Sequence, residues 1–433
     1  MSNRRTFYAV LIVLLLTMVI APAAIAQTDF SGEINFYYLD DRPESRTNWE
    51  MIVAGFNETY PNVTVNLIGG PATEGWDGYA QGAARSIAGG QPLDLIYVAV
   101  EGVATLVDLG VLRSLNDYIA ADQEAVANLM DDVDPALVEP FIIEGNQYLL
   151  PHSWNSMLMY YNTARFDEAG IEAPAEDWTW EDFLAAAQAL TEDTDGDSVP
   201  NRYGFDIGGG PFGLEPWFAS NGGSFMSEDW CTPLLNSPEV VETFDFLRSL
   251  VYDYQVAPTP GSTANLFEQF QNGDISMFAA GRWMVGIFMA ADFDDYDIAY
   301  MPGNPDSGTV VGVDGYAMFN STQNADATWE FIKYLTSESV QQTLVGAEDA
   351  PASNVPARRS VASALENFPP DHADRFYGSL SFGNGANMLP SPKNASDVYG
   401  ALGRAFTNIF SGEVSVEDAL NAAQSEITSS GCS

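Results

Sequence analysis

The chain is poor in basic side chains. Lysine and arginine together number 16 against 60 aspartates and glutamates, Lys333 and Lys393 are the only lysines, and the formal net charge is −44. Nucleic acids and anionic lipid surfaces are bound through basic patches, so this deficit argues against both classes of partner. The charge is compatible with a protein that faces a salty or acidic medium outside the cell.

Histidine is almost as scarce. His152 and His372 are the only two, and neither lies in a metal-binding or catalytic-triad motif. There is no Gly-x-Ser-x-Gly elbow, and Gly208-Gly209-Gly210 lacks the lysine of a phosphate-binding loop. With 60 acids, some carboxylates lie within catalytic distance by chance, so their abundance identifies no active site. We expect no enzyme, and keep a secreted carbohydrate-active hydrolase as the alternative.

Only two cysteines are present, Cys231 and Cys432, and their spacing is not that of metal ligands. In an exported chain they form either a disulfide that ties the chain end to the body or two unpaired thiols. The sequence leaves both open.

The N-terminus has the order of a secretory signal. Arg4-Arg5 precedes an apolar run from Phe7 to Ile20, and Ala24-Ile25-Ala26 has the small residues of a cleavage site. We predict a signal peptide over 1–26, with a retained anchor helix as the alternative. No cysteine for lipid attachment follows it. The mature protein is therefore expected in the periplasm or cell exterior, soluble or loosely associated with the membrane.

Strand and helix patterns alternate along the chain. Strand patterns occupy Glu33–Leu39, Val63–Ile68 and Pro92–Val98, and helical spacing fills Asn48–Tyr60 and Trp76–Ala88 between them. This βαβαβ order predicts an α/β fold with a parallel sheet. Short strands are also expected over 297–301, 309–313 and 316–320.

The length implies two lobes around a cleft. We expect the chain to cross between them near 140–147 and to return later. The predicted division gives a first α/β lobe over 27–140 and 296–346, and a second over 141–295 and 347–433.

Aromatic residues recur at turns and at the ends of predicted elements, namely Trp76, Trp154, Trp217, Trp283 and Tyr399. A sugar offers an apolar face to such rings and a rim of hydroxyls to carboxylates and amides. The alternative for each ring is a place in the core, because large aromatic residues are usually mostly buried. The pattern favours a cleft that binds a neutral polyol.

Four segments in order resemble the sugar-binding receptors of ABC importers, the maltose/multiple-sugar-binding family. They are Tyr148–Asn155 with Tyr160-Tyr161-Asn162, then Phe270–Met277 with Gly281-Arg282-Trp283, then Trp329–Leu335, and finally Ser411-Gly412-Glu413 with Val416–Leu420. The resemblance spans about 33–428. It implies a periplasmic-binding-protein fold, two α/β lobes joined by several hinge crossings, that captures an extracellular sugar or oligosaccharide and presents it to a membrane permease.

The resemblance also implies ligand-binding positions, several of them beyond the carboxyl ends of strands, where open α/β sheets bind ligands. The candidates are Asp41, Arg42, Glu101, Trp154, Asn155, Trp217, Trp283, Asp314 and Tyr399. Val98 stands where maltose-binding members have tryptophan, so maltodextrin is not implied. The same fold tuned to a non-sugar solute such as a polyamine stays an alternative. We expect a monomer that requires no cofactor.

A separate acidic segment resembles the first half of a calcium-binding loop. Its candidate ligands are Asp193, Asp195, Asp197, the carbonyl of Val199, and Asn201. Ser198 replaces the usual glycine, and Gly204 stands where the bidentate glutamate would be. The alternatives are a structural calcium site and a solvated acidic turn.

Overall fold

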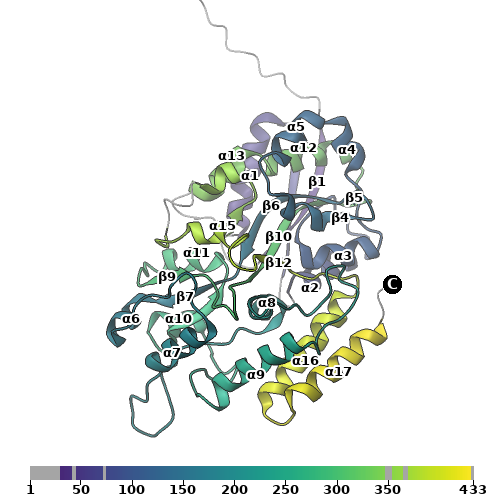
Figure 1. Ribbon diagram of the computed structural model, residues 1–433. Helices are drawn as coiled ribbons and strands as arrows, with labels where there is room; N and C mark the ends of the chain where they lie inside the picture. Colours follow the sequence, from purple (N-terminus) through teal and green to yellow (C-terminus); the bar gives the residue numbers. More distant parts are fainter. Residues whose placement is uncertain (1–29, 41–44, 72–74, 347–353, 364–368, 431–433) are drawn as a thin grey trace, which may run out of the picture.

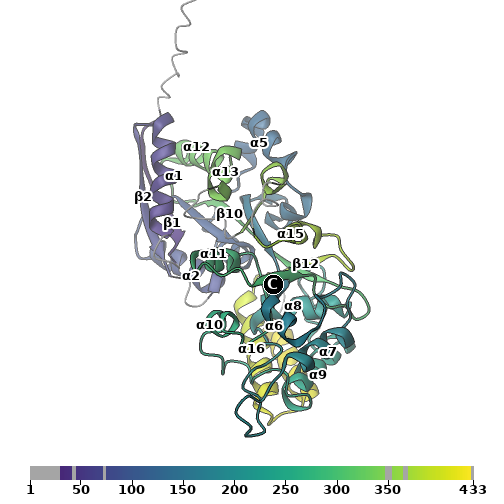
Figure 2. The same ribbon diagram turned by 90° about the vertical axis from the view of Figure 1, so that its left-hand side faces the viewer.

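The structure, a computed structural model, describes residues 30–40, 45–71, 75–346, 354–363 and 369–430. In this part of the chain two α/β bodies lie one above the other, as Figures 1 and 2 show from two sides. The first body is built on a seven-stranded sheet and the second on a three-stranded sheet. No helix within these ranges combines the length and the apolar composition needed to cross a membrane.

The large sheet has parallel and antiparallel parts. Its strands run in the order β11 (Val355–Pro356), β6 (Leu149–Ser156), β10 (Thr309–Met318), β3 (Leu95–Ala99), β1 (Gly32–Leu39) and β2 (Val63–Gly70), with β12 (Ala386–Met388) also paired to β10. Strand β1 is parallel to both β2 and β3, whereas β10 is antiparallel to β3 and β6. The parallel sheet predicted from the first three strands is therefore confirmed.

Helices cover this sheet. They are α1 (Ser45–Thr59), α2 (Gly75–Ala88), α3 (Val100–Asp108), α4 (Asn116–Ala121), α5 (Gln123–Met130), α12 (Ala325–Leu335), α13 (Glu338–Gly346) and α14 (Arg359–Ala362). Aromatic residues pack two of these helices against β1: the buried Phe36 ring of β1 lies 4.8 Å from Trp49 of α1 and 5.9 Å from Phe331 of α12. The 3₁₀ turns Pro135–Leu137 and Glu139–Phe141 lead into a hairpin of β4 (Ile142–Ile143) and β5 (Asn146–Gln147).

The second body has β7 (Leu158–Asn162) between β8 (Met277–Ala280) and β9 (Tyr296–Ala299), all antiparallel. Its helices are α6 (Thr163–Ala169), α7 (Trp180–Leu190), α8 (Gly210–Ser220), α9 (Pro238–Tyr252), α10 (Leu266–Gln271), α11 (Trp283–Ala290), α16 (Ala395–Ser411) and α17 (Val416–Ser430), and α15 (Asp374–Gly378) lies on the return segment. The last two helices pack together at the foot of this body (Figure 1).

The chain changes sheets at Met157, which separates β6 from β7. It returns after β9, because β10 begins at Thr309 in the large sheet. The sequence places the crossing near 140–147, and residues 142–147 form the β4–β5 hairpin. The exact boundaries of the two lobes stay a prediction.

One strand prediction was wrong. The expected short strands 309–313 and 316–320 are a single strand, β10, with a shift in register between Asp314 and Gly315. Strand β6 pairs with both halves of β10 and keeps them continuous. Glycine is needed at 315, because a Cβ there would lie 2.3 Å from the carbonyl oxygen of Leu150.

Candidate functional site

A cavity of about 620 Å³ lies between the two bodies. Elements of the first body supply one wall and elements of the second body the other, while strands β6 and β10 supply the floor. Because both bodies line the same space, a molecule bound there would contact both. Two bodies joined in this way form a cleft, the geometry in which hinge closure around a ligand takes place in other proteins.

The wall of the first body is aromatic. Trp49 of α1, Trp76 at the start of α2 and Tyr97 of β3 line the cavity, and Tyr97 lies 5.8 Å from the Trp49 ring and 5.6 Å from the Trp76 ring. The buried Tyr97 packs against both half-buried indoles and positions them. The exposed part of each indole therefore remains available to a ligand.

The opposite wall comes from α8 and α11. The rings of Phe212 and Trp283 lie 5.9 Å apart and line the cavity together with Ile287. Gly281 leaves room for the Trp283 ring, because a Cβ at position 281 would lie 2.1 Å from the indole. The cavity thus has aromatic rings on two opposite sides.

Two acids face the cavity. Glu101 lies in the first turn of α3, immediately after β3, and Asp314 lies at the register shift of β10, paired with Ala99. Burial raises the pKa of Glu101 to about 7, and the neighbouring Asp314 contributes to the rise. Burial also raises the pKa of Asp314 to about 7, against hydrogen bonds that favour its ionised form.

A polar network connects Asp314 to α11. Ser153 donates to Oδ1 of Asp314 from both its backbone N–H (3.2 Å) and its hydroxyl (2.7 Å), and Asn354 Nδ2 donates to Oδ2 at 3.1 Å. Asn155 Nδ2 donates to Oδ1 of Asn354 at 2.7 Å, and the backbone N–H of Arg282 donates to Oδ1 of Asn155 at 2.9 Å. The floor of the cavity is therefore bonded to the residue before Trp283.

The structure brings together four of the predicted residues, because Glu101, Asn155, Trp283 and Asp314 all line the cavity. Asp41 and Arg42 lie outside the described residues. Several lining residues were not predicted from the sequence, including Trp49, Tyr97, Ser153, Phe212 and Asn354. Alternation along β6 could have indicated Ser153, which shares a strand face with Asn155.

Two of the other three predicted residues lie in the core, while Tyr399 lies near Glu101: burial and then the charge of Glu101 raise the pKa of Tyr399. Trp154 is fully buried on the opposite face of β6, with its ring 5.6 Å from Tyr377. Trp217 is 1% exposed in the core of the second body, where its ring lies 5.3 Å from Phe183. Tyr399 of α16 is half-buried, and its hydroxyl donates to the carbonyl of Pro390 at 2.6 Å. None of the three lines the cavity.

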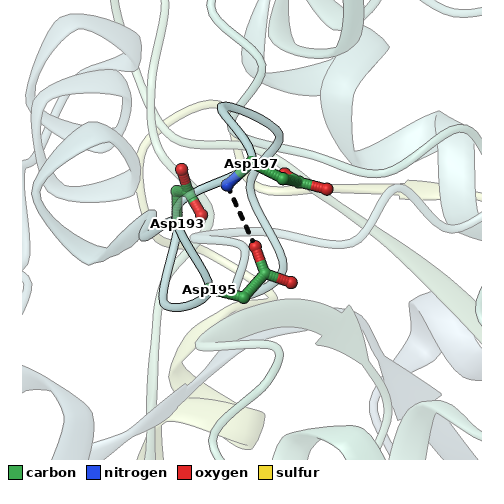
Figure 3. A group of neighbouring side chains, drawn as sticks. All are labelled: Asp193, Asp195 and Asp197. Carbon is green, nitrogen blue, oxygen red and sulfur yellow. Dashed lines mark hydrogen bonds between the residues drawn. The ribbon is translucent and has the colours of Figure 1, made fainter.

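The acidic loop lies in the second body, between α7 and α8, and none of its three aspartates lines the cavity. One oxygen from each of Asp193, Asp195 and Asp197 lies within 4.8 Å of the others, and Figure 3 shows the three exposed side chains around one turn. Backbone N–H groups of Gly196 (2.6 Å) and Ser198 (2.8 Å) donate to Asp193, which lowers the pKa of that carboxyl. Calcium binding stays a prediction for this loop.

Two further ligand candidates in this loop differ in their surroundings. Oδ1 of Asn201 accepts from the N–H and the hydroxyl of Thr194, each at 3.0 Å, while the Val199 side chain is exposed. Cys231 is disulfide-bonded, and Cys432 lies outside the described residues.

Comparison with known proteins identifies the family. The model of the family described as bacterial extracellular solute-binding protein matches residues 41–342. A putative binding protein of Brucella abortus is 24% identical over 329 residues, 72% of this chain and 74% of that protein. An arabinooligosaccharide-binding protein of Halalkalibacterium halodurans is 25% identical over 256 residues, which cover 56% of this chain and 52% of that protein.

Solved structures show the same fold. An ABC substrate-binding protein from Listeria monocytogenes, in complex with cycloalternan, matches with a TM-score of 0.80 at 24% identity, over 92% of this chain and 99% of that one. The predicted periplasmic-binding-protein fold is thereby confirmed. The family model matches more than half of the length of this chain, so this chain belongs to the bacterial extracellular solute-binding protein family.

Proposed function

We propose that this protein captures a sugar or oligosaccharide in the cavity between its two bodies and presents it to the membrane permease of an ABC importer. The observation that carries the proposal is the pair of aromatic walls, Trp49, Trp76 and Tyr97 on one side and Phe212 and Trp283 on the other. Rings on two sides suit the apolar faces of a sugar, and the carboxyls and amides between them suit its hydroxyls.

The size of the cavity supports the same ligand class. A volume of about 620 Å³ lies within the range of roughly 300–1,000 Å³ that is usual for small-molecule sites. One relative is named for arabinooligosaccharide binding, and the Listeria structure holds cycloalternan. A ligand that touches both walls favours the closed arrangement, which is the form that a permease can distinguish from the empty receptor.

Membership in a family of binding proteins confirms the prediction that the chain is not an enzyme, so the hydrolase alternative is set aside. We further propose export by the signal sequence over 1–26, a mature protein in the periplasm or cell exterior, soluble or loosely associated with the membrane, and a structural calcium ion in the acidic loop. The three neighbouring carboxylates support the last of these.

Thermal unfolding in the presence of mono- and oligosaccharides tests the receptor function. A ligand at 100 times its Kd stabilises the folded state by about 2.7 kcal/mol, which raises the Tm of a chain of this length by roughly 3 °C. No shift with any member of a broad panel, and no heat in calorimetry, would contradict the proposal.

A matched pair of variants locates the binding. Trp283→Ala removes a cavity ring and is expected to weaken sugar binding about tenfold or more. Tyr254→Ala removes an exposed ring of the second body that does not line the cavity, so affinity should be unchanged. Equal effects of both variants would place the ligand elsewhere.

A further inference from the structure

Among the described residues that line the cavity, the charged side chains are all acidic. Glu101 and Asp314 face it, and no described residue that lines it is a lysine or an arginine. Neither carboxyl forms an ion pair within the part of the chain that the structure describes. His152 also lines the cavity, but burial lowers its pKa to about 4, so the imidazole is neutral and does not balance the acids.

The two carboxyls differ in how they are satisfied. Asp314 accepts hydrogen bonds from Ser153 and Asn354. Oε2 of Glu101 is buried and has no hydrogen-bond partner among the described residues. A buried acceptor without a partner is costly, and a donor that reaches the Glu101 carboxyl from the cavity would offset that cost.

The neighbourhood of the two acids favours a positively charged donor. Both line the cavity, and Asp314 pairs with Ala99, two residues before Glu101. Burial raises the pKa of each carboxyl to about 7, and Asp314 adds to the rise at Glu101. A cation between them would restore their ionised forms and relieve their mutual repulsion. The rings of Trp49, Trp76 and Tyr97 line the same cavity and attract cations through their faces.

We propose that the cavity selects a carbohydrate that carries a protonated amino group, with the ammonium bound by the carboxyls of Glu101 and Asp314 beside the aromatic wall. The inference rests on the proposed sugar-receptor function and names the class of sugar. A free polyamine would satisfy the acids and leave the second aromatic wall, Phe212 and Trp283, without a ring to stack on. The amino sugar uses both features.

The test compares matched triplets of sugars with the wild-type protein at pH 7. Each triplet contains an amino sugar, its N-acetylated form and its neutral hydroxyl analogue, as monosaccharides and as β-1,4-linked dimers, and isothermal calorimetry measures each Kd. The amino member is expected to bind at least tenfold more tightly than the other two, because hydrogen bonds between charged groups are about twice as strong as neutral ones.

Variants then test whether the preference for amino sugars over neutral sugars depends on the two acids. Glu101→Gln and Asp314→Asn keep the shapes of the side chains and should each reduce the ratio of affinities for the amino and neutral sugars about tenfold. Glu124→Gln changes an exposed glutamate of the first body, outside the cavity, and should leave the ratio unchanged. The wild-type comparison decides the matter even if one variant does not fold.

The outcomes separate the two proposals. Neutral sugars that bind as tightly as amino sugars would overturn the amino-group preference and leave the sugar receptor standing. Binding of spermidine or tetramethylammonium without binding of any sugar would overturn both. A preference that survives in both acid variants would overturn the assignment to Glu101 and Asp314.

Discussion

The buried carboxyl of Glu215 should make the stability of this protein depend on pH. Glu215 lies in α8 and is 0% exposed, with Asn387 Nδ2 donating to it at 2.9 Å. Burial raises its pKa from 4.5 to about 7, although the hydrogen bonds to it act in the opposite direction. The perturbation we consider is Glu215→Gln, which keeps the volume and the polar character and removes the titration.

The sign follows from proton binding. Because the folded-state pKa is raised, the folded protein holds a proton on Glu215 at pH values where the unfolded chain has lost it, between about 4.5 and 7. This contribution to stability is present below pH 4.5 and is lost as the pH rises to 7. Raising the pKa by about 2.5, at about 1.4 kcal/mol for each pH unit, amounts to roughly 3.5 kcal/mol.

Urea unfolding gives the free energy of unfolding of wild type and of Glu215→Gln at pH 5 and at pH 8. The effect is the difference between the changes that the two proteins show between these pH values. From pH 5 to pH 8 the free energy of unfolding should fall by about 2 to 3 kcal/mol more in the wild-type protein than in Glu215→Gln. The repulsion among the many other acids is common to both proteins and cancels. The exposed Glu228 provides a control, since Glu228→Gln should follow wild type. The same loss of stability in wild type and Glu215→Gln would refute the reasoning from burial.

Three other predictions concern packing, the cavity wall and the acidic loop. Trp217→Ala should lower the free energy of unfolding by about 3 to 5 kcal/mol in urea titration while sugar affinity is kept; an affinity loss would contradict its placement in the core. Gly281→Ala should displace the Trp283 ring and weaken sugar binding in calorimetry with little change in Tm; unchanged affinity would show that the indole tolerates the methyl group. Millimolar calcium should raise the Tm, and Asp195→Asn should abolish the rise, with magnesium as the control ion; a Tm that ignores calcium would exclude the site.

Local patterns determined most of the secondary structure. Helix α2 runs over Gly75–Ala88, within one residue of the predicted Trp76–Ala88, because the apolar spacing fixes its buried face. Single glycines were harder to interpret. Gly315 next to Asp314 resembles an interruption, and only the continuous partner β6 shows that the strand carries on through a bulge.

The cavity was only partly predictable, for physical reasons. Rings that fill a core and rings that line a cleft have the same composition, so Trp217 and Trp283 look alike until packing is known. Trp154 and Asn155 are neighbours on one strand and therefore cannot share a face, a signal that was present in the sequence. Asn354 bonds Asn155 across 199 residues, and no local pattern indicates such a contact.

Strand β10 has a consequence for when the protein can fold. It lies between β6 and β3 in the large sheet, yet it is reached only at Thr309–Met318, after the whole of the three-stranded sheet. A chain made from its N-terminus therefore lacks the middle strand of its first body until about three quarters of it has been synthesised, and contacts so distant in sequence form slowly. The order of strands therefore delays completion of the first body until most of the chain has been made.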